Sequence, residues 1–141
     1  MKIIFLDVDG VLNNNKTNTR NPLGFIGVDD TLCQRLREIV VATGAKIVLS
    51  SAWRQYPESL PYLWEHCGPT IECVGQTDYY PNSDRGAEIA DWIEEHPPVD
   101  KFIILDDRED MDPHMDRLVH TDYAVGLTEE DKQLAIQRLN A

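Results

Sequence analysis

Short apolar runs alternate with longer amphipathic stretches from one end of the chain to the other, and this alternation limits the folds open to it. The runs have the length of buried strands, and the apolar residues between them recur at helical spacing. Parallel strands need long crossover connections, which are usually helices, so the pattern predicts a parallel sheet covered by helices. Strands are expected at residues 3–8, 45–49, 70–74, 101–105 and 118–119. The predicted fold class is a small, doubly wound α/β domain.

The expected helices begin at capping residues and end at glycine or proline. The first carries an apolar stripe after Asp30 and stops at Gly44, and the third stops at Pro97-Pro98. The second is interrupted near Pro61, because proline disrupts a helix interior. The helices are expected over residues 30–43, 58–66, 85–95 and a last segment that starts at Thr128.

The length and the charge of the chain restrict its organisation and its partners. With 141 residues it has enough material for one hydrophobic core and too little for two ordinary domains, so a single domain over residues 1–141 is expected. The 13 basic and 25 acidic residues give a net charge of −12, which disfavours nonspecific adhesion to nucleic acid or to an anionic membrane. No stretch has the roughly 18 apolar residues of a membrane span. The apolar run at residues 3–6 is too short for a secretory signal, and we expect a cytoplasmic protein.

The three cysteines, Cys33, Cys67 and Cys73, form no C-x-x-C pair, so the sequence indicates neither a disulfide framework nor a zinc knuckle. A soft-metal site of His66, Cys67 and Cys73 is the alternative, but its spacing is not typical of zinc sites. We expect all three cysteines to be small buried hydrophobes.

Polar and charged side chains follow the carboxyl ends of the predicted strands, where parallel α/β sheets bind their ligands. Asp7-Val8-Asp9-Gly10 follows the first strand, Ser50-Ser51 follows the second, and Asp106-Asp107 follows the fourth. Arg85 opens the helix after the third strand. The site is therefore expected at this edge of the sheet.

Convergence of these acids predicts a magnesium site. Asp7 and Asp9 are two positions apart, so from an extended chain they would reach the same crevice. If Asp106 or Asp107 joins them, carboxylates about 4 Å apart would repel by roughly 4 kcal/mol, and such a cluster requires a cation. Carboxylate oxygens suit Mg²⁺, an ion that bridges carboxylates to a phosphate.

A short hydroxyl such as Ser50 and a fixed positive charge such as Arg85 would then hold the phosphoryl oxygens. Each motif alone also has an ordinary structural interpretation as solvated acids in a turn, a helix cap or a solvated helix residue. Their order along the chain favours phosphoryl chemistry: acids after the first strand, a hydroxyl after the second, a cation on the later helix and acids after the fourth strand.

These residues resemble the four signature motifs of the haloacid dehalogenase (HAD) superfamily. Residues 7–12, Asp-Val-Asp-Gly-Val-Leu, resemble its first motif, D-x-D-G-[TV]-L, and Leu49-Ser50 resembles the second. Arg85 stands at the third motif, which is often Lys, and residues 104–110 resemble the fourth. The resemblance implies a three-layer Rossmann-like HAD fold, with a central parallel sheet of about five strands and no large cap domain.

The resemblance also implies a Mg²⁺-dependent phosphomonoesterase. Asp7 would be the nucleophile that becomes an aspartyl phosphate, and Asp9 would be the general acid and then the general base. Asp7, the backbone carbonyl of Asp9, and Asp106 or Asp107 would hold the metal. Asp110 would orient the waters of the metal.

A narrower resemblance connects the chain to the HAD domain of multidomain RNA-repair proteins and to the phosphatase half of phage polynucleotide kinase-phosphatase. It rests on Ile-Leu-Asp-Asp-Arg at residues 104–108 and on Ser-Ser-Ala-Trp-Arg, which ends at Arg54. It implies phosphorylated RNA or DNA ends as substrates, with 3′-phosphates removed, and makes Ser51, Arg54 and Arg20 candidates for substrate contacts. Between the two serines, Ser50 is favoured as the phosphate contact, because it directly follows the apolar run.

Residues 13–27 form a long polar connection that predicts a small flap over an open site. Aromatic side chains after the second strand, Trp53, Tyr56, Tyr62 and Trp64, would either offer a stacking face for a base or pack over the edge of the sheet. His114 and His120 follow the fourth motif, where a role in the site and an ordinary surface position are both open.

Three other functions remain as alternatives. The chain could be a HAD phosphatase for small metabolites or nucleotides, or a phosphomutase that returns the phosphate to its substrate. It could also be a regulatory module that binds phosphate without turnover, although neither residues 74–75 nor 118–120 carry the residues typical of a receiver domain. The oligomeric state is not determined by the sequence.

Overall fold

The computed structural model describes all 141 residues and contains one five-stranded sheet in which every pair of neighbours is parallel. The strand order is β3-β2-β1-β4-β5. The strands are β1 (Lys2–Leu6), β2 (Lys46–Leu49), β3 (Cys73–Gln76), β4 (Lys101–Asp106) and β5 (Leu118–His120). The predicted α/β Rossmann-like fold is confirmed.

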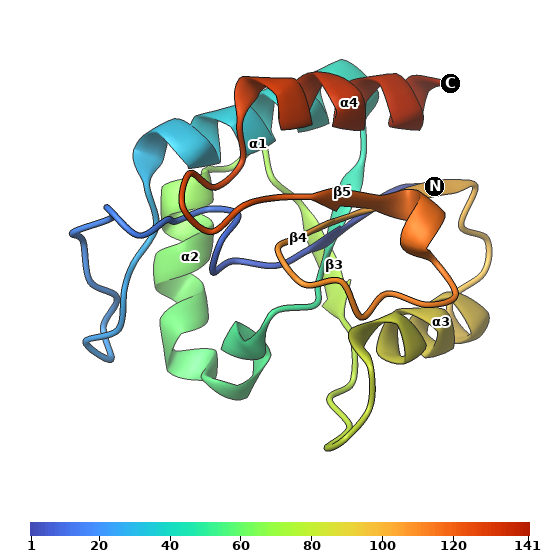
Figure 1. Cartoon of the computed structure of the whole chain (residues 1–141), viewed down its shortest axis with the longest axis horizontal. Helices are drawn as coiled ribbons and strands as arrows, with labels where there is room; N and C mark the ends of the chain where they lie inside the picture. The colour runs from blue at the N-terminus through green and yellow to red at the C-terminus, as the bar shows by residue number, and fades with distance from the viewer.

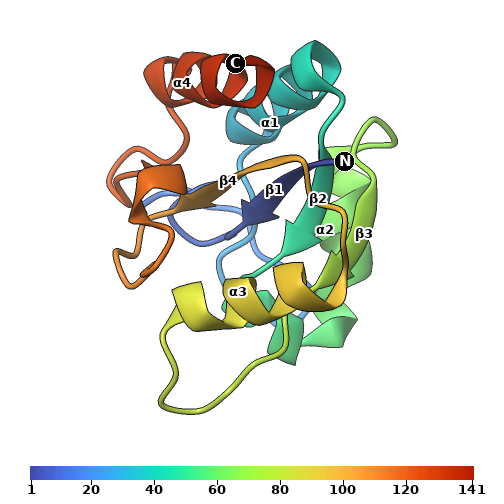
Figure 2. The ribbon, with the colours of Figure 1, turned by 90° about the vertical axis from the view of Figure 1, so that its right-hand side faces the viewer.

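Helices cover both faces of this sheet and give the domain three layers (Figures 1 and 2). The helices α1 (Asp30–Thr43), α2 (Leu60–Cys67) and α4 (Glu129–Asn140) contribute to the core on one face. The helix α3 (Arg85–Glu95) covers the opposite face. Three short 3₁₀ helices, η1 (Ala52–Gln55), η2 (Pro57–Ser59) and η3 (Met115–Arg117), lie in the connections.

The two cores follow from the alternation of side chains along each strand. In β1, Ile4 and Leu6 face the larger core, while Ile3 and Phe5 face α3. Phe5 meets Trp92 of α3 edge to face, with ring centroids 5.7 Å apart. Because both faces of the sheet are covered, the inner strands β1, β2 and β4 carry runs of apolar residues instead of alternating apolar and polar ones.

Three helix ends agree with the capping signals in the sequence, whereas no side chain of the N-cap residue caps α2 or α3. Asp29 accepts hydrogen bonds from the first turn of α1, and Gly44 closes this helix in the left-handed conformation with φ of 74°. Thr128 and Asp131 form a reciprocal capping box at the start of α4. These local signals determine both ends of α1 and the start of α4.

Several boundaries differ from the prediction. The strand β1 ends at Leu6 and not at residue 8, because the chain turns there, with Gly10 at φ of 84°. The strand β3 lies at residues 73–76 instead of 70–74, since it is an exposed edge strand whose apolar residues do not define its ends. Residues 57–59 form η2, and α2 starts after it with Pro61 in its first turn, where proline is tolerated.

The cysteines are only partly as expected. Cys33 and Cys67 are fully buried in the larger core, whereas Cys73 is exposed on β3 because this edge strand has a neighbour on one side only. The expectation of three buried cysteines was therefore wrong for Cys73. The only group of His, Cys, Asp and Glu side chains close enough to share a metal ion consists of aspartates, so the soft-metal alternative is not supported.

The topology reverses direction between β1 and β4, and this reversal positions the site. From β1 the chain adds β2 and β3 on one side, crosses by α3 and adds β4 and β5 on the other side. The connections leave β1 and β4 in opposite directions, which opens a crevice at the carboxyl ends of these two strands. Asp7 and Asp107 directly follow them.

Candidate active site

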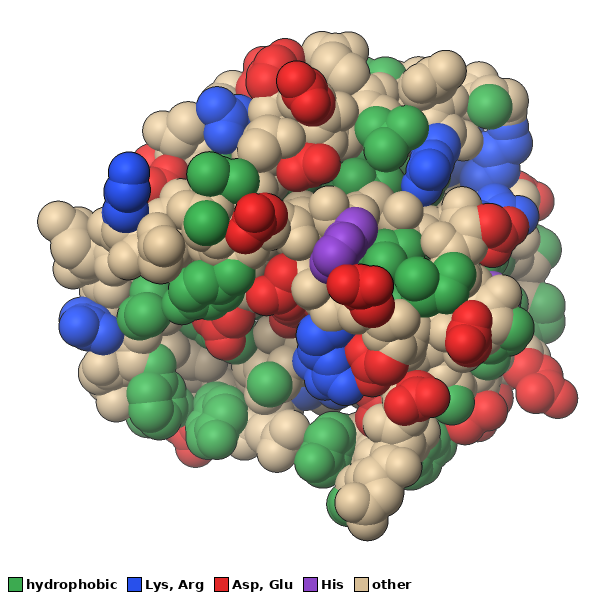
Figure 3. Space-filling model, viewed as in Figure 1, with side chains coloured by type: hydrophobic (Ala, Val, Ile, Leu, Met, Phe, Trp, Pro, Cys, Tyr) green, Lys and Arg blue, Asp and Glu red, His purple; other side chains and the backbone are tan.

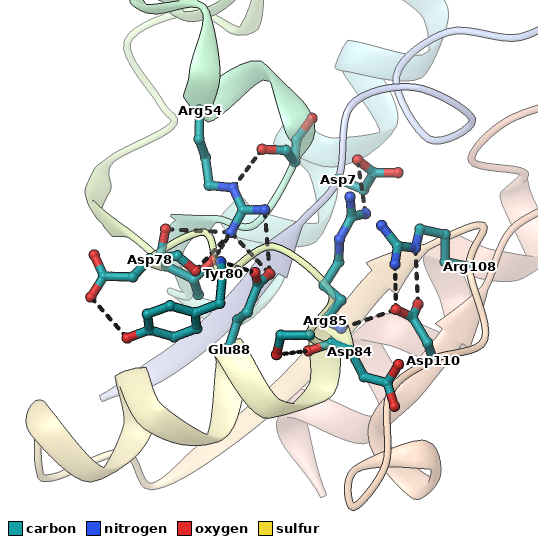
Figure 4. A network of polar contacts seen from close by, with 12 residues as sticks. Asp7, Arg54, Asp78, Tyr80, Asp84, Arg85, Glu88, Arg108 and Asp110 are labelled. Atoms are coloured by element: carbon teal, nitrogen blue, oxygen red, sulfur yellow. Dashed lines mark hydrogen bonds and ion pairs between the residues drawn. The ribbon is translucent and has the colours of Figure 1, made fainter.

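Three aspartates converge at this crevice. One carboxylate oxygen from each of Asp7, Asp106 and Asp107 lies within 4.8 Å of the other two. The Nη1 atom of Arg85, the first residue of α3, lies 2.8 Å from Asp106 Oδ2 and 3.3 Å from Asp7 Oδ1. Figure 4 shows the Arg85 side chain directed at Asp7 from the helix below. Three carboxylates and one guanidinium leave an excess of two negative charges at this place when all are ionised.

Burial makes this excess costly. Asp7 is 4% exposed, and burial together with the neighbouring Asp106 raises its pKa well above the usual value, despite the opposing effect of Arg85. Burial and Asp106 also raise the pKa of Asp107. Burial would lower the pKa of Arg85, but Asp7 and Asp106 outweigh it and the pKa rises. The cluster is therefore short of positive charge.

A divalent cation fits this deficit, and the hydrogen bonds indicate which carboxylates are available to it. Asp106 is fully buried and engages both oxygens, Oδ2 with Arg85 Nη1 and Oδ1 with the backbone N–H of Arg108 at 3.0 Å. Asp107 is only half-buried and reaches the loop after β1, since a Cβ atom at Gly10 would overlap its carboxylate. Asp7 and Asp107 are thus the best placed ligands, and oxygen donors of this kind suit Mg²⁺.

Two buried polar atoms beside the cluster have no hydrogen-bond partner. They are the Oγ atom of Ser50, which follows β2, and the Nε atom of Arg85. Buried donors without a partner are rare in folded proteins, and a bound anion is one explanation for them. A hydroxyl and a guanidinium at a helix N-terminus are both suited to phosphoryl oxygens.

The two serines have different surroundings. Ser51 Oγ accepts a hydrogen bond of 3.1 Å from the backbone N–H of Trp53 and so caps η1. Ser50 Oγ makes no such bond. Ser50 is therefore the serine whose hydroxyl is available to a ligand, and its contact with phosphate stays a prediction.

Asp9 is separate from the buried cluster and is exposed. Its Oδ1 accepts hydrogen bonds from Asn13 Nδ2 at 2.9 Å and from Trp53 Nε1 at 3.2 Å. These two donors fix the orientation of the carboxyl group and leave Oδ2 available. Because the strand ends at Leu6, a turn and not the pleat of an extended strand sets the relation between Asp7 and Asp9.

Asp110 does not join the carboxylate cluster. Its oxygens bind the side chain of Arg108 and the backbone N–H of Arg85, and the hydrogen bond from Arg108 keeps its pKa low against the effect of burial. Asp110 thereby provides a hydrogen-bond acceptor for the first backbone N–H of α3, where the Asp84 side chain forms no cap. The structure thus places this residue at the start of α3, outside the carboxylate cluster.

Arg54 is engaged by the protein itself. Its guanidinium lies 3.3 Å from Glu88 Oε1, and both side chains are 3% exposed. It also binds Thr77 Oγ1 and the backbone carbonyl of Ser51. Glu88 in turn accepts a hydrogen bond from the Tyr80 backbone, so η1, α3 and the loop after β3 are joined in one network (Figure 4).

The side chains of the remaining candidates form no ion pair with the three clustered aspartates. Arg20 is exposed in the flap, where its backbone pairs with Ile26 across an isolated bridge, and no hydrogen bond or ion pair joins its side chain to the aspartates. His120 contacts the backbone carbonyl of Asp107 at 2.9 Å. His114 packs edge to face on Phe102, with ring centroids 5.1 Å apart, and burial lowers its pKa.

The aromatic residues after β2 divide into two groups. Tyr62 and Trp64 pack against the larger core, and the Tyr62 hydroxyl accepts a hydrogen bond of 3.2 Å from the backbone N–H of Val28, just after the flap. Trp53 is itself a buried member of this core, and it borders a pocket next to Asp9 together with Tyr56, which is 43% exposed. Core packing therefore accounts for Trp53, Tyr62 and Trp64, and of these four residues only Tyr56 has an exposed ring.

Sequence reasoning missed residues that organise the site. Asn13 is fully buried, and it binds Asp9, the Gly10 N–H and the carbonyl of Gly27. Thr121 donates to the carbonyl of Gly10 at 2.7 Å. Asn13 lies at the start of the flap, and its position three residues after Gly10 was the one available signal. Thr121 and Glu88 carry no local signal, because their partners are far away in the sequence.

A family model described as the HAD domain in Swiss Army Knife RNA repair proteins matches residues 3–132, which cover the sheet and every helix except the greater part of α4. The chain belongs to this family. The match confirms the resemblance to the HAD superfamily that the motifs predicted, and also the narrower resemblance to the HAD domain of RNA-repair proteins. Phosphatase-type chemistry is what this superfamily membership suggests for it. No curated protein and no solved structure matched the chain. None of its helices is both long enough and apolar enough to span a membrane.

Proposed function

We propose that this HAD domain is a Mg²⁺-dependent phosphomonoesterase that removes 3′-phosphates from RNA or DNA ends. The observation that carries the proposal is the group of buried carboxylates at the switch point, facing one arginine and the unpartnered Ser50 hydroxyl. This arrangement combines a nucleophile, donors for phosphoryl oxygens and ligands for a divalent cation.

In the first half of the reaction an Asp7 carboxylate oxygen attacks phosphorus. A bond between Asp7 and phosphorus forms while the bond from phosphorus to the ester oxygen breaks, and Asp9 gives its proton to the departing oxygen. In the second half Asp9 accepts a proton from water, whose oxygen attacks the same phosphorus. The bond between phosphorus and Asp7 breaks, which releases inorganic phosphate and regenerates the Asp7 carboxylate.

The surrounding residues hold the reacting groups. Ser50 Oγ and Arg85 bind the phosphoryl oxygens, and Asp106 positions the Arg85 guanidinium through their 2.8 Å contact. Asp7, Asp107 and the backbone carbonyl of Asp9 would hold Mg²⁺, which neutralises charge on the phosphoryl group when bound. Phosphate monoesters are among the slowest compounds to hydrolyse without catalysis, which explains why a covalent step and a metal would act together.

An open site supports a polymer end as the substrate. The segment between β1 and α1 is too short for a cap domain, and the connections between the later strands carry only short 3₁₀ helices and the single helices α2 and α3. A site without a large lid can admit a chain end, whereas many enzymes for small metabolites close over their substrate. The family description, which names RNA repair proteins, agrees with this substrate class.

The test is phosphate release from 3′- and 5′-phosphorylated RNA and DNA oligonucleotides, free nucleotides, a sugar phosphate and an aryl phosphate, with and without Mg²⁺. We expect release that requires Mg²⁺ and prefers 3′ ends, and we expect Asp7→Asn to abolish it. Glu94→Gln, which neutralises an exposed acid of α3, is the matched control and should keep full activity. Release from the sugar phosphate alone would replace the nucleic-acid proposal with a metabolite phosphatase. Transfer of the phosphate to a second hydroxyl would instead indicate a mutase.

A further inference from the structure

A pocket of about 380 Å³ opens next to Asp9 and is bordered by η1. Three segments that are far apart in the sequence surround it. They are the flap, the η1 and η2 region, and the loop between β5 and α4. Hydrophobic side chains gather at the lower left of Figure 3, over the area where Figure 1 shows the flap and η1.

Each of the three segments contributes an exposed aromatic ring. Phe25 of the flap is 54% exposed, Tyr56 is 43% exposed and Tyr123 is 38% exposed. The rings of Phe25 and Tyr56 contact each other at a tilt of 59°, with centroids 5.7 Å apart. The chain as a whole is strongly charged, with a net charge of −12. Three exposed aromatic rings around one pocket therefore form an apolar patch, and exposed apolar patches often mark binding sites.

The pocket ends in polar groups at its inner side. Asp9 lines it, and hydrogen bonds from Trp53 and Asn13 occupy only one of the two Asp9 oxygens. Asn21 also lines it and is 6% exposed. The Asn21 Oδ1 accepts from the Leu23 and Phe25 backbones, so its Nδ2 is the atom able to donate to a ligand.

The size of the pocket indicates its occupant. A cavity of roughly 150 Å³ is sufficient for benzene, so 380 Å³ is more than a single phenyl ring requires. Aromatic side chains stack on bases at about 1–3 kcal/mol per base, and a base also has polar edges for an amide such as that of Asn21. A nucleobase with its sugar matches this combination of size, flat apolar walls and a polar inner end.

We propose that Phe25, Tyr56 and Tyr123 form the binding site for the nucleobase of the leaving group, and that they determine substrate specificity. This inference rests on the proposed function, because it assigns the pocket beside Asp9 to the part of the substrate that departs with the proton from Asp9. The flap then acts as one wall of a base-binding site, since Phe25 brings its ring from there. Trp53 is excluded from this set because it orients Asp9.

Binding can be tested without any turnover. In an Asp7→Asn background, adenosine and uridine are titrated and followed by NMR chemical shifts, with ribose as the ring-free control. We expect saturable shifts at the three aromatic residues for both nucleosides and none for ribose. Phe25→Leu and Tyr123→Leu should each weaken binding about 5- to 100-fold, the range expected for loss of one stacking partner. Phe25→Tyr and Tyr123→Phe keep the aromatic ring and should bind the nucleosides as tightly as the parent.

Val41→Ala, which shortens an exposed side chain on α1, is the neutral control. Nucleosides that leave the aromatic residues unshifted, or leucine variants that bind as tightly as the parent, would overturn the proposal. Phenol binding as tightly as the nucleosides, with the same sensitivity to the leucine variants, would overturn the nucleobase assignment in favour of a simple aryl group.

Kinetics separate this inference from the proposed function. The ratio of kcat/KM for a nucleoside 3′-phosphate to that for glycerol 2-phosphate should fall in the leucine variants, while kcat/KM for glycerol 2-phosphate stays unchanged. An equal loss for both substrates would contradict a base-binding role but leave the phosphatase intact. If no substrate is hydrolysed, the proposed function fails, and the nucleoside titrations alone decide whether the pocket binds bases.

Discussion

Individual side chains at the site show a division between groups that hold the protein together and groups that are free to act. Asp106 and Ser51 engage their polar atoms within the chain, whereas their sequence neighbours Asp107 and Ser50 retain free ones. Adjacent residues of the same type thus have different roles, because consecutive side chains point in different directions.

Ser50→Ala and Ser51→Ala should separate these roles. Ser50→Ala removes a buried hydroxyl without a partner, so we expect no loss of stability but a kcat/KM lower by about tenfold to a hundredfold, the loss of a hydrogen bond to a charged phosphoryl group. Ser51→Ala removes the cap of η1 and should lower the free energy of unfolding by about 1 kcal/mol.

Thermal unfolding and steady-state kinetics on both variants check this prediction. The assignment of the serines is wrong if Ser51→Ala has the larger effect on kcat/KM, or if Ser50→Ala has the larger effect on stability.

At the scale of elements, a buried ion pair fixes α3 relative to η1. Glu88 lies one turn after Arg85 on α3 and pairs with Arg54 of η1, with both side chains almost inaccessible to solvent. Burial lowers the pKa of Arg54, and Glu88 opposes that effect. Since the same helix presents Arg85 to the aspartates, this pair also helps to position the Arg85 guanidinium.

Glu88→Ala should therefore destabilise the fold by about 3–5 kcal/mol, because it leaves the Arg54 charge buried without its partner. Glu72→Ala breaks the exposed pair with Lys46 and should cost at most about 1 kcal/mol, which makes it the matched control. Denaturant unfolding measures both. A double variant, Arg54→Met with Glu88→Leu, should recover most of the lost stability, and failure to do so would mean that packing and not the unpaired charge is responsible.

For the molecule as a whole, the clustering of buried carboxylates makes the free energy of unfolding depend on pH, and it would make it depend on a bound metal ion. The raised pKa values of Asp7 and Asp107 mean that the folded state binds more protons than the unfolded state above the ordinary aspartate value near 3.8. In the metal-free protein, these two carboxyl groups therefore destabilise the fold increasingly as the pH rises from about 3.8 through their raised pKa values. The destabilisation is greatest at neutral pH. A bound divalent cation reverses the effect.

We thus expect Mg²⁺ to raise the Tm of the protein at pH 7 and to raise it less near pH 5, where the carboxyl groups are partly protonated. Asp7→Asn removes one of the charges and should raise the Tm of the metal-free protein at pH 7 while reducing the gain from Mg²⁺. Scanning calorimetry with Mg²⁺ or EDTA at both pH values tests this. A gain from Mg²⁺ that is the same in Asp7→Asn would show that the cation binds elsewhere.

Local signals in the sequence determined the class of the fold and the chemical types at the site. Apolar runs with helical stretches between them predicted the sheet and its covering helices, because hydrophobic periodicity depends only on near neighbours. The motif residues Asp7, Asp106, Asp107 and Arg85 were predicted to meet because parallel strands end at one edge, and the structure places them within contact of one another.

The tertiary structure alone decided which of these residues are free and which are occupied. Asp110 and Arg54 are bound by partners that lie 25 and 34 residues away in the sequence, Asp110 by the Arg85 backbone and Arg54 by Glu88. The pocket beside Asp9 likewise takes Phe25, Tyr56 and Tyr123 from three separate segments. Such contacts join positions with no local relation, so no pattern of spacing or composition along the chain could have identified them.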